Sequence, residues 1–374
     1  MSGGTLPLKA ESVKKLAVIG PHANGSVIFL GGPNYHGDNE LISSNTPLLR
    51  ARAKLPGAQV TFAEGCNVTC PSTGGFAAAT AAAAGADTVV MFLGLDDTIE
   101  NEGHDRVSLE LPGKQMELAL AVVKATKPGA KVIVVLVNGG PIAIKELKES
   151  AKVGAIVDAF MPGQAAAEAT FQLLLGEASF SGLLPVTVYA ADFIQQRPIT
   201  NLDLRAQGGV TYRYFEGTPL WPFGHGMSYG VFDFKASAEK KTLKTTVAKA
   251  SSPAGKHQPL CFNVTVSAAK GGMASDVAVL AFLQPQQVAS DAVSKKLPNA
   301  QLCDFTKLAS VQPGEQREVS LCVNGLGPGL QHVTEDGSTV VLAGEYLMTV
   351  GVKSEGSVGG AGAGSVIGEV VVLE

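Results

Sequence analysis

The densest group of reactive side chains in the sequence is an acidic stretch at residues 95–106, LDDTIENEGHDR. It holds five carboxylates and directly follows an apolar run that ends at Gly94. In an open α/β sheet, the loops that leave the carboxyl ends of the strands form the ligand crevice, so these carboxylates are well placed for acid–base chemistry. A solvated acidic loop, held by Asp105 and Arg106, explains the same pattern, and both interpretations stay open at this point.

Within this stretch, Glu102 is the residue that we expect to act as a general acid. Glu100 and Asp105 supply like charges, which disfavour ionisation of a neighbouring carboxyl group, and a proton donor must keep its proton near the working pH. Gly103 lets the backbone approach a ligand closely. Glycoside cleavage with retention of configuration needs a second carboxyl group about 5 to 5.5 Å from the first, and that group must lie elsewhere.

Several other chemistries are disfavoured by the sequence. The run from Gly20 to Ser26 has the glycine spacing of a phosphate-binding loop, but Ser26 stands where that motif needs lysine. No dinucleotide fingerprint follows a predicted strand, and the serine of residues 226–230 follows no buried strand, as a nucleophile elbow would require. The six histidines are scattered, so we expect neither a metal site nor a cofactor.

The elements that must position the acidic stretch alternate along the chain as in an α/β fold. Apolar runs predict strands at 16–19, 60–62, 88–93, 132–137 and 155–160. Helical periodicity predicts helices at 46–54, 75–84, 114–126, 142–150 and 165–175. Nearly continuous apolar strands indicate burial on both faces of a mostly parallel sheet. We therefore predict a three-layer α/β sandwich over residues 1–230, including a strap between domains at 205–230.

Beyond Phe234 the pattern changes to alternating apolar and polar residues between Gly, Pro and Ser clusters. Strands are predicted at 261–266, 277–283, 317–323, 345–352 and 366–373, with no convincing helix. This spacing predicts an all-β sandwich of fibronectin type III character over residues 231–374. The Gly-rich stretch 356–365 predicts a flexible hairpin tip.

The composition excludes several classes of protein. The 374 residues carry a formal net charge of -4, too near balance for a nucleic-acid binder. With 45% hydrophobic and 17% charged residues, the chain is expected to form compact domains. No apolar run has the length of a membrane span, and the first fifteen residues lack the apolar core of a signal peptide.

The cysteines and glycosylation sequons leave the compartment open. Five cysteines are present; Cys66 and Cys70 either bridge a tight loop or stay as two free thiols, and the partners of the other three are not fixed by the sequence. N-x-S/T sequons begin at Asn24, Asn67 and Asn263, and such sequons also occur by chance in chains of this length.

Five segments in register resemble the C-terminal portion of glycoside hydrolase family 3. They are LAVIGPHAN at 16–24, GLDDTIENEGHDR at 94–106, LPGKQ at 111–115, GLLPVT at 182–187, and VTYRYFEG at 210–217 with WPFGHGMSY at 221–229. The GLDDTIENEG run, with GCNVTC at 65–70 and Gly75-Phe76, is most similar to the β-xylosidase and α-arabinofuranosidase branch. Residues 235–374 resemble the fibronectin type III-like domain that closes such proteins.

The resemblance implies roles for three residues. Glu102 matches the family's general acid/base, which protonates the glycosidic oxygen and later activates water. Asp105 and Arg106 match the tail of the same motif and bind substrate or shape the loop. The family's nucleophile is an aspartate in an N-terminal (β/α)8 barrel, and no residue of this chain matches it. The strap is interpreted as structural.

The implied function is hydrolysis of O-glycosidic bonds by an exo-acting, retaining β-xylosidase that degrades xylo-oligosaccharide or arabinoxylan. This chain would supply the acid/base half, with a (β/α)8 barrel in cis or in trans, and would have no nucleic-acid or membrane partner. The alternatives are a non-catalytic carbohydrate-binding module and an inert fragment without the barrel. The family also implies an extracellular or cell-wall location, although this chain shows no signal peptide.

Overall fold

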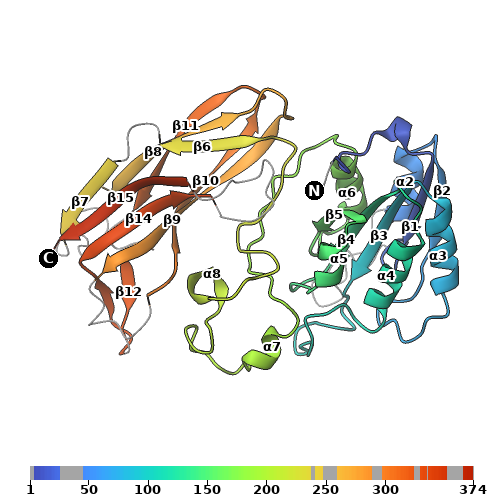
Figure 1. Ribbon diagram of the computed structural model, residues 1–374, viewed down its shortest axis with the longest axis horizontal. Helices are drawn as coiled ribbons and strands as arrows, with labels where there is room; N and C mark the ends of the chain where they lie inside the picture. Colours follow the sequence, from blue (N-terminus) through green and yellow to red (C-terminus); the bar gives the residue numbers. More distant parts are fainter. Residues whose placement is uncertain are drawn as a thin grey trace. The chain divides into compact units, whose positions relative to one another are not determined.

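The computed structural model describes residues 4–25, 45–236, 241–246, 259–288, 297–323, 329–334, 336–351 and 365–373 (Figure 1). The chain divides into two compact units. The first comprises Met1–Ala178 with Tyr189–Ile194, and the second comprises Ser179–Val188 with Gln195–Glu374. None of the helices in the described part of the chain has the length and hydropathy of a membrane span.

The first unit is built on a five-stranded parallel sheet in the order β2-β1-β3-β4-β5. Its strands are β1 (Lys15–Ile19), β2 (Gln59–Ala63), β3 (Thr88–Gly94), β4 (Lys131–Val137) and β5 (Val153–Asp158). All seven residues of β3 are buried, whereas most of the edge strand β2 is exposed. The central strands are therefore covered on both faces, as their continuous apolar sequences predict.

Helices cover both faces of this sheet. They are α2 (Pro47–Lys54), α3 (Phe76–Gly85), α4 (Gln115–Ala125), α5 (Lys145–Glu149) and α6 (Ala166–Leu174), and an exposed 3-10 helix, η1 (Ala10–Ser12), precedes β1. α2 packs with α6, and α3 packs with α4. The connection from β1 to β2 runs along the sheet in one direction, and the connections from β2 to β3 and from β3 to β4 run in the other. Because such connections are right-handed, the pair α2 and α6 lies on one face of the sheet and the pair α3 and α4 on the other. The predicted three-layer α/β sandwich is confirmed.

The second unit is dominated by two sheets, in the orders β10-β9-β14-β15-β7 and β11-β8-β6. The strands are β6 (Phe232–Ala236), β7 (Lys241–Thr246), β8 (Leu260–Ala268), β9 (Ser275–Val288), β10 (Gln301–Val311), β11 (Gln316–Val323), β14 (Gly344–Val350) and β15 (Ser365–Leu373), with a separate pair β12 (Gln331–Val333) and β13 (Thr339–Val341). A buried cluster that includes Phe262 and Tyr346 draws residues from both sheets.

This arrangement confirms the predicted all-β unit, while its fibronectin type III-like classification stays a prediction. The five predicted strands correspond to β8, β9, β11, β14 and β15, whereas β6, β7, β10, β12 and β13 were not expected. The predicted hairpin tip lies outside the described residues, apart from Ser365 at the start of β15.

The strap at 205–230 groups with the second unit by its contacts, and the predicted domain boundary at residue 230 stays a prediction. The strap contains α8 (Thr211–Tyr214), and a short helix α7 (Phe193–Gln196) precedes it. The hydroxyl of Tyr212 accepts a hydrogen bond from the backbone of Leu302 at 3.2 Å, and its ring stacks on Phe223 at 4.5 Å. The hydrogen bond attaches the strap to strand β10, and the ring stacking holds two parts of the strap together.

Candidate active site

The acidic loop begins where β3 and β4 approach each other closely. Gly94, the last residue of β3, has φ +144°, and a Cβ atom built there would lie 1.8 Å from the carbonyl oxygen of Val137. Leu95 then donates its backbone N–H to the same oxygen at 2.8 Å. Only glycine fits this position, so the chain leaves the sheet at one defined point.

A buried glutamine fixes the start of the loop to its neighbours. Gln115, the first residue of α4, accepts from the backbone N–H of Gly94 at 3.0 Å and donates to the Gly94 carbonyl at 2.8 Å. The same amide nitrogen donates to the carbonyl of Val68 at 2.7 Å. Sequence analysis included Gln115 in a matching motif but gave it no role. The sequence feature that could have indicated this role is a polar residue on the otherwise apolar face of a helix.

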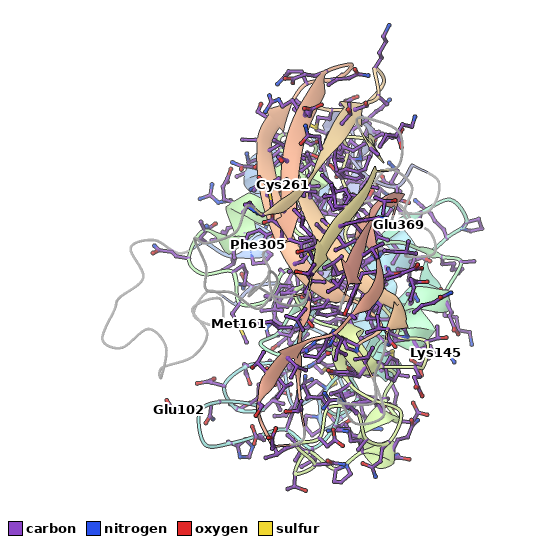
Figure 2. All side chains as sticks on the ribbon, turned by 90° about the vertical axis from the view of Figure 1, so that its left-hand side faces the viewer. Glu102, Lys145, Met161, Cys261, Phe305 and Glu369 are labelled. Carbon is purple, nitrogen blue, oxygen red and sulfur yellow. A yellow bond between two sulfur atoms is a disulfide. The ribbon has the colours of Figure 1, made fainter. Side chains whose placement is uncertain are left out.

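Glu102 lies at the tip of a tight turn. The backbone N–H and C=O groups of Asn101 and His104 bond reciprocally at 3.0 Å, which leaves Glu102 and Gly103 as the central residues. Gly103 has φ +85° and nothing within 4 Å of a built Cβ atom, so the glycine suits the turn, and the close approach to a ligand stays a prediction. The Glu102 side chain is exposed, on a loop at the margin of the ribbon (Figure 2).

The base of this turn is clamped to the loop after β4. Oε2 of Glu100 lies 2.9 Å from Nε of Arg106, and Oε1 accepts from the backbone N–H of Gly140 at 2.8 Å. Arg106 also donates from Nη2 to the carbonyl of Pro141 at 2.5 Å. Burial lowers the pKa of the Arg106 guanidinium, and the charge of Glu100 opposes that shift. These contacts, which we call the Glu100–Arg106 clamp, join two loops at the carboxyl end of the sheet.

The clamp differs from the expected pairing of Asp105 with Arg106. The guanidinium binds Glu100, and Asp105 is exposed. Glu100 therefore does not act as an uncompensated like charge on Glu102. Within the described residues, the carboxylates of Glu102 and Asp105 have no hydrogen-bond or ion-pair partner. The loop thus exposes the carboxylates of Glu102 and Asp105, while the carboxylate of Glu100 holds the base of the turn in place.

The loop after β5 joins the same network. Asn138 at the end of β4 donates from its side chain to the carbonyl of Gly140 at 3.0 Å, and from its backbone to the carbonyl of Phe160 at 3.2 Å. Burial raises the pKa of Asp158, while hydrogen bonds from the Phe160 backbone and the Asn138 side chain act in the opposite direction. Hydrogen bonds therefore link the loops at the carboxyl ends of β3, β4 and β5, beside the base of the Glu102 turn.

The loop after β1 contributes a neutral histidine. His22 is fully buried beside β3, and its backbone N–H donates to the carbonyl of Phe92 at 3.3 Å. Burial lowers its pKa to about 4, although a hydrogen bond with the Gly94 backbone acts in the other direction. It is uncharged at neutral pH and helps to pack the loop. No cluster of His, Cys, Asp and Glu in the described ranges could hold a metal ion.

Comparison with known proteins adds to this geometry. The sequence model of the glycosyl hydrolase family 3 C-terminal domain matches residues 2–229. The chain belongs to glycosyl hydrolase family 3. The Glu102 loop, the clamp and Gln115 all lie within the matched part. Family 3 membership confirms the resemblance drawn from the sequence motifs.

Similar proteins carry xylosidase names. A probable exo-1,4-beta-xylosidase of Aspergillus fumigatus is 36% identical over 360 residues, which are 93% of this chain and 44% of that protein. An exo-1,4-beta-xylosidase of Emericella nidulans is 34% identical, over 94% of this chain and 44% of its own. The family 3 chain thus spans less than half the length of these relatives.

Solved structures show the same fold. A family 3 exo-beta-xylosidase, XlnD, in complex with a xylobiose aziridine activity-based probe, has a TM-score of 0.83 and 26% identity, covering 99% of this chain and 46% of that one. A family 3 beta-glucosidase from Bifidobacterium adolescentis has a TM-score of 0.73 and 26% identity, covering 97% of this chain and 50% of its own.

Proposed function

We propose that this chain carries the general acid/base of a family 3 glycosidase and that Glu102 is that residue. The observation that carries the proposal is an exposed carboxylate, held at the tip of a turn whose base is clamped by Glu100 and Arg106. Such a group can protonate the glycosidic oxygen of a bound sugar and then remove a proton from water. Its exposure leaves it accessible to a substrate held by another domain.

The nucleophile must come from outside this chain's described site. As the family resemblance implies, a (β/α)8 barrel in cis or in trans would supply an aspartate on the opposite face of the sugar. A retaining reaction needs the two carboxyl groups about 5 to 5.5 Å apart. In this assignment Asp105 accepts hydrogen bonds from sugar hydroxyls, and Arg106 shapes the loop through the clamp.

The substrate that we propose is a xylo-oligosaccharide or arabinoxylan, cut from its non-reducing end. Support comes from the exo-1,4-beta-xylosidase names of the relatives and from the xylobiose aziridine probe bound in the XlnD structure. We also propose an extracellular or cell-wall location, where xylan is available.

The test is Glu102→Gln in a protein that includes the barrel. We expect turnover of xylobiose to fall by about 10²- to 10⁴-fold, because a poor leaving group needs protonation. An aryl xyloside with a good leaving group should keep its first step, since its departure needs no proton. Glu149→Gln, at the end of α5 and just before the amino end of β5, is the matched control and should leave both rates unchanged. Equal rates on xylobiose before and after Glu102→Gln would contradict the assignment.

The alternatives are separated by the 374-residue chain itself. Calorimetry with xylobiose, alongside a turnover assay, distinguishes three outcomes. Binding without turnover, when a barrel protein is also present, favours a carbohydrate-binding module. Neither binding nor turnover favours an inert fragment. Turnover that appears only when the barrel is added supports the proposed half-site.

A further inference from the structure

The loop after β2 holds an exposed asparagine inside a small disulfide ring. Cys66 and Cys70 form a disulfide, and Asn67-Val68-Thr69 lies between them. Oδ1 of Asn67 accepts from the backbone N–H of Cys70 at 2.9 Å and from the hydroxyl of Thr69 at 3.2 Å. Within the described residues Nδ2 of Asn67 has no partner, and the side chain is exposed. The amide nitrogen is thus directed to solvent while the oxygen is held.

Of the other two sequons, Asn263 differs in this respect, whereas Asn24 is also exposed and also bonds through Oδ1 but lies beside a helix cap and not in a disulfide ring. Asn263, in the middle of β8, donates from Nδ2 to the carboxylate of Glu318 on β11 at 3.0 Å. Asn24 accepts from the hydroxyl of Thr46, the residue that caps α2, at 3.0 Å. A sugar on Asn263 would displace a cross-strand contact, and one on Asn24 would stand beside a helix cap. Asn67 can carry a substituent on Nδ2 without losing any contact in the described structure.

The disulfides provide an independent observation about the compartment. Besides the Cys66–Cys70 ring, Cys261 and Cys322 form a second disulfide between the paired strands β8 and β11. Disulfides form and persist in oxidising compartments such as the secretory pathway, where asparagine is also glycosylated. The loop after β2 therefore contains both a sequon and a disulfide, and the compartment that forms disulfides is also the one that glycosylates asparagine.

We propose that Asn67 carries an N-linked oligosaccharide. In the reaction, Nδ2 of Asn67 attacks the anomeric carbon of a lipid pyrophosphate-linked oligosaccharide, and a new carbon–nitrogen bond forms. The bond between that carbon and the pyrophosphate oxygen breaks, and the lipid pyrophosphate leaves with the electron pair. The amide proton passes to a base of the transferase. No oxidant or reductant takes part.

The position of the sugar relative to Glu102 follows from the sheet. β2 and β3 are separated by β1, and strands lie about 4.8 Å apart, so the two loops leave the same end of the sheet about 10 Å from each other. Gln115 bridges them, because its Nε2 reaches both Val68 and Gly94. The sugar would thus be attached on the β2 side of the acidic loop, whereas the clamp lies on its β4 side.

The test uses the protein isolated from its natural source. After proteolysis, peptide N-glycosidase in heavy-oxygen water converts a glycosylated asparagine into labelled aspartate, which mass spectrometry locates. We expect the label at Asn67 in a peptide whose Cys66 and Cys70 were disulfide-bonded. In a secreting host, Thr69→Ala should abolish the modification, while Thr69→Ser, which keeps the sequon, should retain it. An unlabelled Asn67 overturns the proposal, whether or not the disulfide is found.

Discussion

The Glu100–Arg106 clamp can be tested by one isosteric change. Glu100→Gln keeps the shape of the side chain but removes its charge. The two side chains are 20% and 12% exposed, so solvent screens their interaction only in part. Hydrogen bonds to charged groups contribute about 1.5–3 kcal/mol, so we expect Glu100→Gln to lower the free energy of opening this partly exposed loop by about 2 kcal/mol.

The readout is hydrogen exchange at the backbone amide of Gly140, which donates to Glu100 at 2.8 Å. Because opening the loop exposes this amide, a loss of about 2 kcal/mol should speed its exchange about 30-fold. The matched control is Glu149→Gln, whose partner Lys145 lies 3.8 Å away in a pair that is 64% and 60% exposed. Surface pairs of this kind contribute little, so the control should change exchange by about twofold at most. Similar exchange at Gly140 in both variants would refute the clamp.

Three further predictions concern the same end of the sheet. Because burial raises the pKa of Asp158, its ionisation opposes folding; Asp158→Asn should therefore stabilise the protein at pH 7, and the gain should vanish as the pH falls towards 4. His22 has a pKa of about 4 in the folded state and 6.5 in the unfolded state, so stability should fall as the pH drops through that window, and His22→Gln should remove this slope. Gly94→Ala should cost at least about 3 kcal/mol, whereas Gly103→Ala should cost about 1 kcal/mol, since only the former meets another atom.

Thermal unfolding of the unchanged protein, Asp158→Asn and His22→Gln between pH 4 and 7 checks the first two of these predictions. A stability difference for Asp158→Asn that stays constant with pH would contradict the proton linkage. For the glycines, unfolding temperatures of the two alanine variants are compared directly. Equal shifts would mean that the close approach of Gly94 to Val137 does not constrain the fold.

The inner strands of the first unit were predictable because each is a short, nearly continuous apolar run. β3 was expected at 88–93 and lies at Thr88–Gly94, and β4 was expected at 132–137 and lies at Lys131–Val137. Strand β10 was missed, since most of its side chains are half-buried or exposed and its sequence lacks a clear apolar alternation. Edge strands give a weak signal because they bury little surface.

The interior of the site was less predictable than its location. The sequence indicated that the acidic loop follows a buried strand, and the structure places it there. It could not indicate which acid pairs with Arg106, because Asp105 is its neighbour in sequence while Glu100 reaches it only through the turn at Gly103. The role of Gln115 likewise depends on a contact with Val68 across a large separation in sequence.

The pairing of β7 with β15 has a consequence for synthesis of the chain. β15 lies between β14 and β7 and runs parallel to β7, although β7 ends at Thr246 and β15 begins only at Ser365. Until the ribosome has translated β15, β7 has no partner in that sheet, and β14, once it has been made, keeps one open edge. Nascent chains at this stage expose strand edges to one another, and such edges associate readily. The larger sheet of the second unit is therefore complete only when β15 emerges, whereas the first unit has all its strands by Asp158.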